Sequence, residues 1–403
     1  MIQILKDNNI IATLEKDNKN FILNYKDNIE LKDSISLSLP ANKKYYIFDS
    51  FPPFFETFLP EGYLYEIFKN IIMKEYGNID DFLLFSFLAA NIDGRIKFHT
   101  DLSKLDFPHF DIDEVLNNDD DDLFNRILHT FLNKNAISGV QPKTIAFIKD
   151  SIQTKEYILK TWGNEFPFLS ENEFFCIKAL KYAGVKTVNL KLSKNKKFLL
   201  VEKFNYDKNR DEFLGFEEVL SLMNKNRIQK YSGSYEQVAK IIYGYTTDKL
   251  ESMKEFYTMT VMNFLLKNGD AHLKNFGLLY DNNIKNIVIS PAYDVVNTVV
   301  YLFKDKPALT LNGQKIWHDK DKLIEFGIKN CFLNKEQVLK IWDKCIEALR
   351  EIIKEIKIYI NNNNDFKNIG ERMIDIFEIS LSGEKFKEIP HEITRSWNTN
   401  KKN

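Results

Sequence analysis

Short alternating runs of apolar and polar residues open the chain and predict a β-meander. Residues 2–5, 10–14 and 21–25 alternate with a period of two, and Asp, Asn and Lys residues separate them as turn formers. Further along, residues 64–76 and 81–88 carry apolar side chains at helical spacing. The first hundred residues are therefore predicted to form a small unit of strands and helices.

A second group of strands is predicted in the middle of the chain. Residues 145–148 and 156–160 have the composition of strands, and Lys, Asp and Ser at 149–151 predict the turn between them. Residues 174–182 form a helical run, and residues 198–204 form an apolar strand that ends in mixed polarity. This order is typical of a mixed unit in which a helix packs on a sheet.

From about residue 210 the pattern is mostly helical. An apolar helical run precedes Asn268, and two strand-like runs at 276–280 and 284–289 are joined by an Asp-Asn-Asn turn. Residues 335–360 carry apolar side chains at helical spacing and predict a long helix that faces the core. Strands followed by a mostly helical part, with no internal repeat, predict an α+β fold.

Composition narrows the class of protein. A chain of 403 residues is long enough for two or three domains, and 44% hydrophobic residues suffice for their cores. The net charge of −1 argues against a dominant nucleic-acid-binding surface. Cys176, Cys331 and Cys345 lack C-x-x-C spacing, which fits a reducing compartment without disulfides or a zinc site. With no signal-peptide pattern and no run of ~18 apolar residues, we expect a cytoplasmic protein with no membrane partner.

The candidate chemistry centres on residues 268–275, NGDAHLKN. Asp270 and Asn275 have the spacing of a phosphoryl-transfer catalytic loop, in which the aspartate accepts a hydroxyl proton and the asparagine holds magnesium. Asp294 follows the predicted hairpin, so a second metal ligand can reach the same site. Alone, the Asp-x-x-x-x-Asn spacing is weak, because Asp and Asn are ordinary loop residues and a surface loop would explain them.

A nucleotide-binding half is predicted upstream. Residues 136–144, AISGVQPKT, form a glycine-containing loop in which backbone N–H groups can approach phosphate oxygens; the loop lacks the Walker A ending. Lys160, at the end of the following strand, is placed to contact the α- and β-phosphates, although an isolated lysine there would be a solvated charge. Its predicted ion-pair partner on the helix is Glu173, with Glu171 as the alternative. The strand at 198–204 suits a hinge that binds the adenine edge.

In combination these segments resemble the HipA family of serine/threonine-kinase toxins from bacterial type II toxin–antitoxin modules. The N-terminal part agrees, because FFETFLPEGYL at 54–64 is similar to the family's LPEG segment. The resemblance extends from the first strands to at least Val296. It implies a kinase-like bilobal fold, with an N-terminal HipA-type subdomain at 1–100, a small lobe at 101–207 and a helical large lobe at 208–403.

The resemblance implies a role for each matching residue, with ATP and Mg²⁺ as cofactors. Asp270 matches the catalytic aspartate, and Asn275 and Asp294 match the magnesium ligands. Glu173 would form the structural ion pair. The residues assigned to ATP binding are Ser138, Gly139, Val140, Gln141, Pro142, Lys143, Lys160, Glu202, Lys203, Phe204, His272, Lys274 and Tyr293.

Some family members autophosphorylate a serine of the phosphate loop, which then leaves the pocket. The first of the two positions that can carry this serine is Ala136 here, so Ser138 is the candidate autophosphorylation site. A phosphate would add about −1.5 to −2 charges where the nucleotide phosphates bind.

The resemblance also implies partners. Family members phosphorylate aminoacyl-tRNA synthetases, which stops translation and growth, and they pair with a helix-turn-helix antitoxin that holds them on operator DNA. Two alternatives stay open. A small-molecule phosphotransferase of the same fold would also use the sequence Gly269-Asp270-Ala271-His272, and a pseudokinase would bind only an antitoxin or a nucleotide. The intact set of Asp270, Asn275, Asp294 and Lys160 favours an enzyme.

Overall fold

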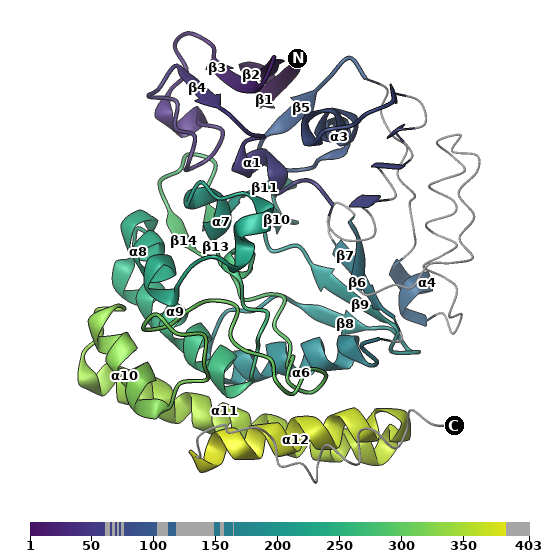
Figure 1. Ribbon diagram of the computed structural model, residues 1–403, viewed down its shortest axis with the longest axis vertical. Helices are drawn as coiled ribbons and strands as arrows, with labels where there is room; N and C mark the ends of the chain where they lie inside the picture. The colour runs from purple at the N-terminus through teal and green to yellow at the C-terminus, as the bar shows by residue number, and fades with distance from the viewer. Residues whose placement is uncertain are drawn as a thin grey trace.

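An antiparallel sheet of five strands, in the order β4-β3-β2-β1-β5, forms the N-terminal part of the molecule. The computed structural model describes residues 1–60, 65–66, 69–70, 72–73, 76–102, 112–117, 149–153, 157–163 and 165–383 (Figure 1). The strands of this sheet are β1 (Ile2–Lys6), β2 (Asn9–Asp17), β3 (Asn20–Tyr25), β4 (Tyr45–Phe48) and β5 (Lys97–His99). The three strands predicted from alternation are confirmed. Ile2, Ile4 and Leu14 are fully buried on one face, as a period of two requires.

Helices α1 (Pro53–Glu56) and α3 (Asp81–Leu88) cover this sheet. The 3₁₀ turn η1 (Leu31–Asp33) lies between β3 and β4, and η2 (Ala89–Asn91) directly follows α3. The predicted helix at 81–88 is confirmed. The Asp80 side chain starts it by accepting a hydrogen bond from the Leu83 amide at 2.9 Å, a standard N-cap. The predicted helix at 64–76 lies largely outside the described residues. We refer to β1–β5 with α1 and α3 as the N-terminal subdomain.

A second sheet, in the order β6-β7-β9-β8, lies in the middle of the chain. Its elements and the adjoining ones are α4 (Ile112–Asn117), β6 (Lys149–Gln153), β7 (Tyr157–Trp162), α6 (Leu169–Tyr182), β8 (Leu190–Leu192), β9 (Phe198–Glu202), β10 (Tyr206–Asp207) and β11 (Glu212–Phe213). Val115 of α4 packs with Leu159, Phe198 and Leu200 on one face of the sheet. Residues of α6, among them Phe175, belong to the larger core cluster on the other side.

Two sequence predictions are corrected in this sheet. Residues 149–151, predicted as a turn, lie in β6, where Lys149 pairs with Trp162 and Ser151 with Lys160. The antiparallel ladder with β7 outweighs the local turn preference of Asp and Ser. Lys160 therefore lies inside β7 and does not end it. The predicted strand at 145–148 lies outside the described residues.

The remainder is mostly helical, as the pattern predicts, with one small sheet of order β12-β13-β14. Its elements are β12 (Gly215–Glu218), α7 (Val219–Leu222), η4 (Arg227–Tyr231), α8 (Tyr235–Tyr245), α9 (Lys249–Leu265), η5 (Leu273–Asn275), β13 (Gly277–Tyr280), β14 (Ile287–Ile289), α10 (Lys320–Lys329), α11 (Lys335–Asn362), η6 (Asn364–Phe366) and α12 (Lys367–Ser382). α11 and α12 lie side by side at the end farthest from the N-terminal sheet (Figure 1). None of the helices in the described ranges is long and apolar enough to cross a membrane.

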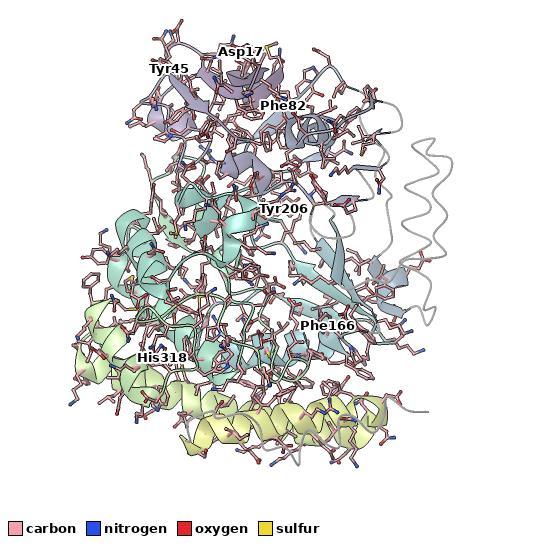
Figure 2. All side chains as sticks on the ribbon, viewed as in Figure 1. Asp17, Tyr45, Phe82, Phe166, Tyr206 and His318 are labelled. Atoms are coloured by element: carbon pink, nitrogen blue, oxygen red, sulfur yellow. The ribbon has the colours of Figure 1, made fainter. Side chains whose placement is uncertain are left out.

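Buried polar contacts join the N-terminal subdomain to the sheet formed by β12, β13 and β14. Lys6 Nζ and Arg95 Nη2 donate to the Asn282 carbonyl, at 2.9 and 3.1 Å, in the turn between β13 and β14. Glu217 of β12 is fully buried, and its carboxylate accepts a hydrogen bond from the Ser38 amide at 3.1 Å. Burial raises the pKa of Glu217. Figure 2 shows side chains filling the region between the subdomain, marked by Phe82, and the rest of the chain, marked by Tyr206.

Candidate active site

The loop after α9 presents Asp270 at the surface of the helical part. Asn268 is buried, donates to Asn263 Oδ1 at 2.9 Å and accepts the Asp270 amide at 3.2 Å. The Gly269 amide donates to Thr298 Oγ1 at 2.8 Å. A Cβ on Gly269 would meet the Asp305 carboxylate and lie 2.6 Å from that hydroxyl oxygen, so both side chains would have to shift to admit any other residue. These contacts fix the backbone on both sides of a half-exposed carboxylate.

Asn275 and Asp294 meet from opposite sides of the β13–β14 hairpin. The Asn275 Nδ2 group donates to the Asp294 carbonyl at 3.0 Å and lies 3.4 Å from Asp294 Oδ2. Asp294 has a φ of 56°, a left-handed conformation that is strained for a residue other than glycine and that clusters at functional sites. Asn275 Oδ1 is buried and has no hydrogen-bond partner among the described residues. An amide oxygen and a carboxylate are ligands that Mg²⁺ prefers, so these two residues fit the ion.

Lys160 reaches the same point from β7. Its Nζ lies 2.6 Å from Glu173 Oε1 and 3.0 Å from Asp294 Oδ1, and the Glu173 side chain is only 2% exposed. Of the two candidate partners, Glu173 makes the ion pair. Glu171 is 1% exposed, and burial raises its pKa to about 7. Strand β7, helix α6 and the segment after β14 thus converge on one ammonium group.

A pair of asparagines that the sequence reasoning missed ties α6 to the segment after Asp294. Asn172 Nδ2 donates to the Asn297 carbonyl at 2.9 Å, and the Asn297 amide donates to Asn172 Oδ1 at 2.8 Å. Both residues are fully buried. Asn172 stands between the two candidate glutamates in the sequence, but nothing in its spacing indicates a partner 125 residues away. The pair holds Glu173 and Asp294 at a fixed separation.

The predicted hinge lies beside an aromatic cluster. Phe204 stacks on Tyr293 with ring centroids 5.6 Å apart, and Tyr293 Oη donates to the Lys274 carbonyl at 2.5 Å. Burial lowers the pKa of Lys203 to about 8. Glu202 is already engaged, because its amide donates to the Asn189 carbonyl at 2.9 Å.

The Glu202 carboxylate is engaged as well. It accepts hydrogen bonds from Lys208 and Asn189, and the Lys208 bond lowers its pKa. If the hinge binds the adenine base of ATP, the contacts would therefore come from Lys203 and Phe204 more than from Glu202.

Other predicted residues surround the loop. The His272 amide donates to the Asp270 carbonyl at 2.8 Å, and Lys274 Nζ lies 3.8 Å from Glu218 Oε1. Tyr231 Oη donates to Asp270 Oδ1 at 3.0 Å, a contact that sequence reasoning missed because 39 residues separate the two. The predicted phosphate loop, Ser138, Gly139, Val140, Gln141, Pro142 and Lys143, lies outside the described residues.

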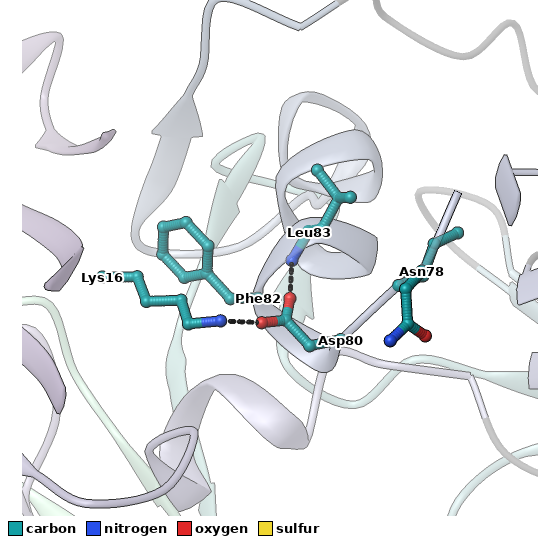
Figure 3. Close-up of a pocket in the computed structure, with 6 residues that line it drawn as sticks. Lys16, Asn78, Asp80, Phe82 and Leu83 are labelled. Atoms are coloured by element: carbon teal, nitrogen blue, oxygen red, sulfur yellow. Dashed lines mark hydrogen bonds and ion pairs between the residues drawn. The ribbon is translucent and has the colours of Figure 1, made fainter. Parts of the chain in front are cut away.

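The pocket drawn in Figure 3 belongs to the N-terminal subdomain and not to this site. It is lined by Lys16, Asp80, Phe82 and their neighbours, and its charged groups pair with each other. Asp80 also caps α3, so its carboxylate has a structural role. The candidate site therefore remains the group formed by Lys160, Asp270, Asn275 and Asp294.

Comparisons with known proteins show the family of the chain. The family model for the HipA-like C-terminal domain matches residues 135–353, more than half of the chain, and the model for the HipA N-terminal domain matches residues 2–99. A Haemophilus influenzae protein named "Putative kinase" is 29% identical over 55% of this chain and 72% of its own length. The Sinorhizobium fredii protein "Putative kinase Y4dM" is 24% identical over 75% of this chain and 76% of its own length.

A solved structure shows the same fold. It is the HipA, HipB and operator DNA complex of a Shewanella oneidensis MR-1 toxin–antitoxin system, and it covers 94% of this chain and 97% of its own with a TM-score of 0.70. The sequence identity is 14%, so this likeness concerns the fold alone. The predicted α+β, kinase-like fold is confirmed. With both family models matched in order along the sequence, the chain belongs to the HipA-like family.

Proposed function

We propose that this protein is an ATP-dependent serine/threonine protein kinase. The observation that carries the proposal is the convergence of Lys160, Glu173, Asn275 and Asp294 in one place, with Asp270 on the same short loop as Asn275. These side chains come from β7, α6, η5 and the segment after β14. A surface loop and an unrelated turn would not bring a lysine, a buried glutamate and a strained aspartate into contact.

Each residue has a role in phosphoryl transfer. Lys160 would bind the α- and β-phosphates while Glu173 holds its side chain in place. Asn275 and Asp294 would hold Mg²⁺, which neutralises charge on the β- and γ-phosphates when bound. Asp270 would orient the acceptor hydroxyl and take its proton. Ser138 to Lys143 would cover the phosphates, with Ser138 as the autophosphorylation site.

We further propose that the kinase is the toxin of a toxin–antitoxin module. The support is membership in the HipA-like family and the Shewanella HipA structure, which was solved with HipB and operator DNA. The expected partners are a helix-turn-helix antitoxin, operator DNA through that antitoxin, and a protein substrate, with an aminoacyl-tRNA synthetase as the first candidate.

The test compares cells that express the wild type, Asp270→Asn and a control, Asp343→Asn, which changes an exposed aspartate on α11 in the same way. Growth arrest and new phosphoserine or phosphothreonine sites should appear with the wild type and the control but not with Asp270→Asn. Phosphorylated metabolites without phosphoproteins would instead support the small-molecule phosphotransferase. Equal phosphorylation by Asp270→Asn would refute the catalytic assignment.

A further inference from the structure

The start of η4 is held by the N-terminal subdomain. The Arg227 amide donates to Glu56 Oε2 of α1 at 2.7 Å, and Arg227 Nη2 donates to both carboxylate oxygens of Asp81 on α3, at 2.9 and 3.1 Å. The guanidinium also lies over the Tyr65 ring, 4.2 Å from its centroid, and Tyr65 Oη donates to Asp81 at 2.9 Å. Glu56 is 9% exposed, so its bond to the amide is shielded from water.

The end of η4 contacts the catalytic loop. Tyr231, its last residue, donates to Asp270 Oδ1 at 3.0 Å and packs edge-on against the His272 ring at 5.3 Å. Lys315 Nζ donates to the Tyr231 carbonyl at 2.9 Å. The aspartate therefore receives a hydrogen bond from a side chain whose backbone is itself anchored.

The two ends are linked rigidly because η4 is only five residues long and is capped. Asn226 accepts a hydrogen bond from the Gln229 amide at 3.3 Å, and Gln229 Oε1 accepts the Asn226 amide at 3.1 Å, which makes a capping box. A displacement of Arg227 would therefore be passed to Tyr231 within about one and a half turns.

We propose that Tyr231 is a positioning residue for Asp270. The N-terminal subdomain fixes the position of Tyr231 through its contacts with Arg227. The inference rests on the proposed function, because it concerns the aspartate assigned as the proton acceptor. Arg227 is bonded to Glu56 and Asp81, and Tyr231 is bonded to the Asp270 carboxylate, so the expected effect is on turnover more than on nucleotide binding.

The first experiment measures the rate at which the purified full chain transfers radiolabelled phosphate from MgATP to the proteins of a dialysed bacterial extract, with ADP as the other product. Tyr231→Phe removes the hydroxyl and keeps the ring on His272, and Tyr243→Phe on α8 is the matched control. We expect Tyr231→Phe to lower kcat about tenfold, the cost of one hydrogen bond to a charged group, with KM for ATP within twofold of the wild type. A kcat within twofold of the wild type would overturn the role of Tyr231.

The second experiment tests the link to the N-terminal subdomain. Arg227→Gln should also lower kcat, and the double variant with Tyr231→Phe should be no slower than the slower single variant, because both act on one contact. Arg350→Gln on α11 is the control, and Asp81→Asn weakens the same contact where Arg227→Gln does not fold. Multiplicative losses in the double variant would show that Arg227 acts separately and would refute the link.

The two experiments separate this inference from the proposed function. Equal protein phosphorylation by the wild type and Asp270→Asn, in cells and in the extract, would remove the proposed function and this inference together. An active wild type with a normal Tyr231→Phe variant would remove this inference alone.

Discussion

Replacing Glu171 by glutamine should change how stability depends on pH. Glu171 is 1% exposed, and its Oε2 atom has no hydrogen-bond partner among the described residues. Burial raises the pKa of this carboxyl from its ordinary value of 4.5 to about 7. The folded protein therefore holds a proton on Glu171 at pH values where the unfolded chain has released it.

The sign and size of the pH dependence of stability follow from this difference in pKa. A carboxyl whose folded pKa is raised contributes stability below pH 4.5, and that contribution is lost as the pH rises through about 7. Each pH unit between the two values corresponds to about 1.4 kcal/mol, so the loss by pH 8 is about 3 kcal/mol. Glutamine cannot ionise and keeps the size of the side chain, so Glu171→Gln avoids this loss.

The assay is urea unfolding followed by circular dichroism at pH 5 and pH 8, for the wild type and Glu171→Gln. The free energy of unfolding of the variant, relative to the wild type, should rise by about 2 kcal/mol between the two pH values, because part of the loss has already occurred at pH 5; groups common to both proteins cancel. A relative stability that stays constant with pH would refute the burial of a protonated Glu171.

Glu173→Gln, two residues away on the same helix, is the matched contrast. It breaks the 2.6 Å pair with Lys160 and should lower nucleotide affinity, whereas Glu171→Gln should leave affinity unchanged.

Three further predictions concern the site. Asp294→Ala should lose the thermal stabilisation by ATP with Mg²⁺, and an unchanged melting shift would exclude it as a metal ligand. Phosphate on Ser138 should be found by mass spectrometry in the wild type and be absent from Asp270→Asn; phosphate only at other residues would contradict the loop assignment. Gly269→Ala should lower kcat about 100-fold with ATP binding retained, because its Cβ would displace the Asp305 and Thr298 side chains and shift the loop; wild-type turnover would show that the loop tolerates the shift.

The alternation of side chains predicted much of the fold because burial on one face of a strand leaves a direct mark on the sequence. Strands β1 to β3 were predicted this way, and helix α3 was predicted from the helical spacing of its apolar residues. The turn predicted at 149–151 is wrong because these residues pair with Trp162 and Lys160 in a sheet, and a local pattern does not contain that pairing. Long-range pairing decided the structure there.

In the site, too, some features follow from the local sequence and others from long-range packing. Asp270 and Asn275 lie on one loop, so their spacing is visible in the sequence. The choice between Glu171 and Glu173 depends on which face of helix α6 is turned toward β7. The contact between Tyr231 and Asp270 depends on the packing of η4 against the loop that carries Asp270. Neither leaves a periodic mark, so both required the structure.

The residues that hold the site in place fall into two groups, and changes in each group should affect a different property of the enzyme. Asn172 and Asn297 fix the side that carries Glu173 and Asp294, where phosphates and Mg²⁺ would bind. Arg227 and η4 fix the side that carries Asp270, where the acceptor hydroxyl would lie. Changes in the first group should therefore act mainly on nucleotide affinity, and changes in the second mainly on turnover. The N-terminal subdomain belongs to the second group, which gives it a role in catalysis although it contributes none of the residues assigned to the reacting centre.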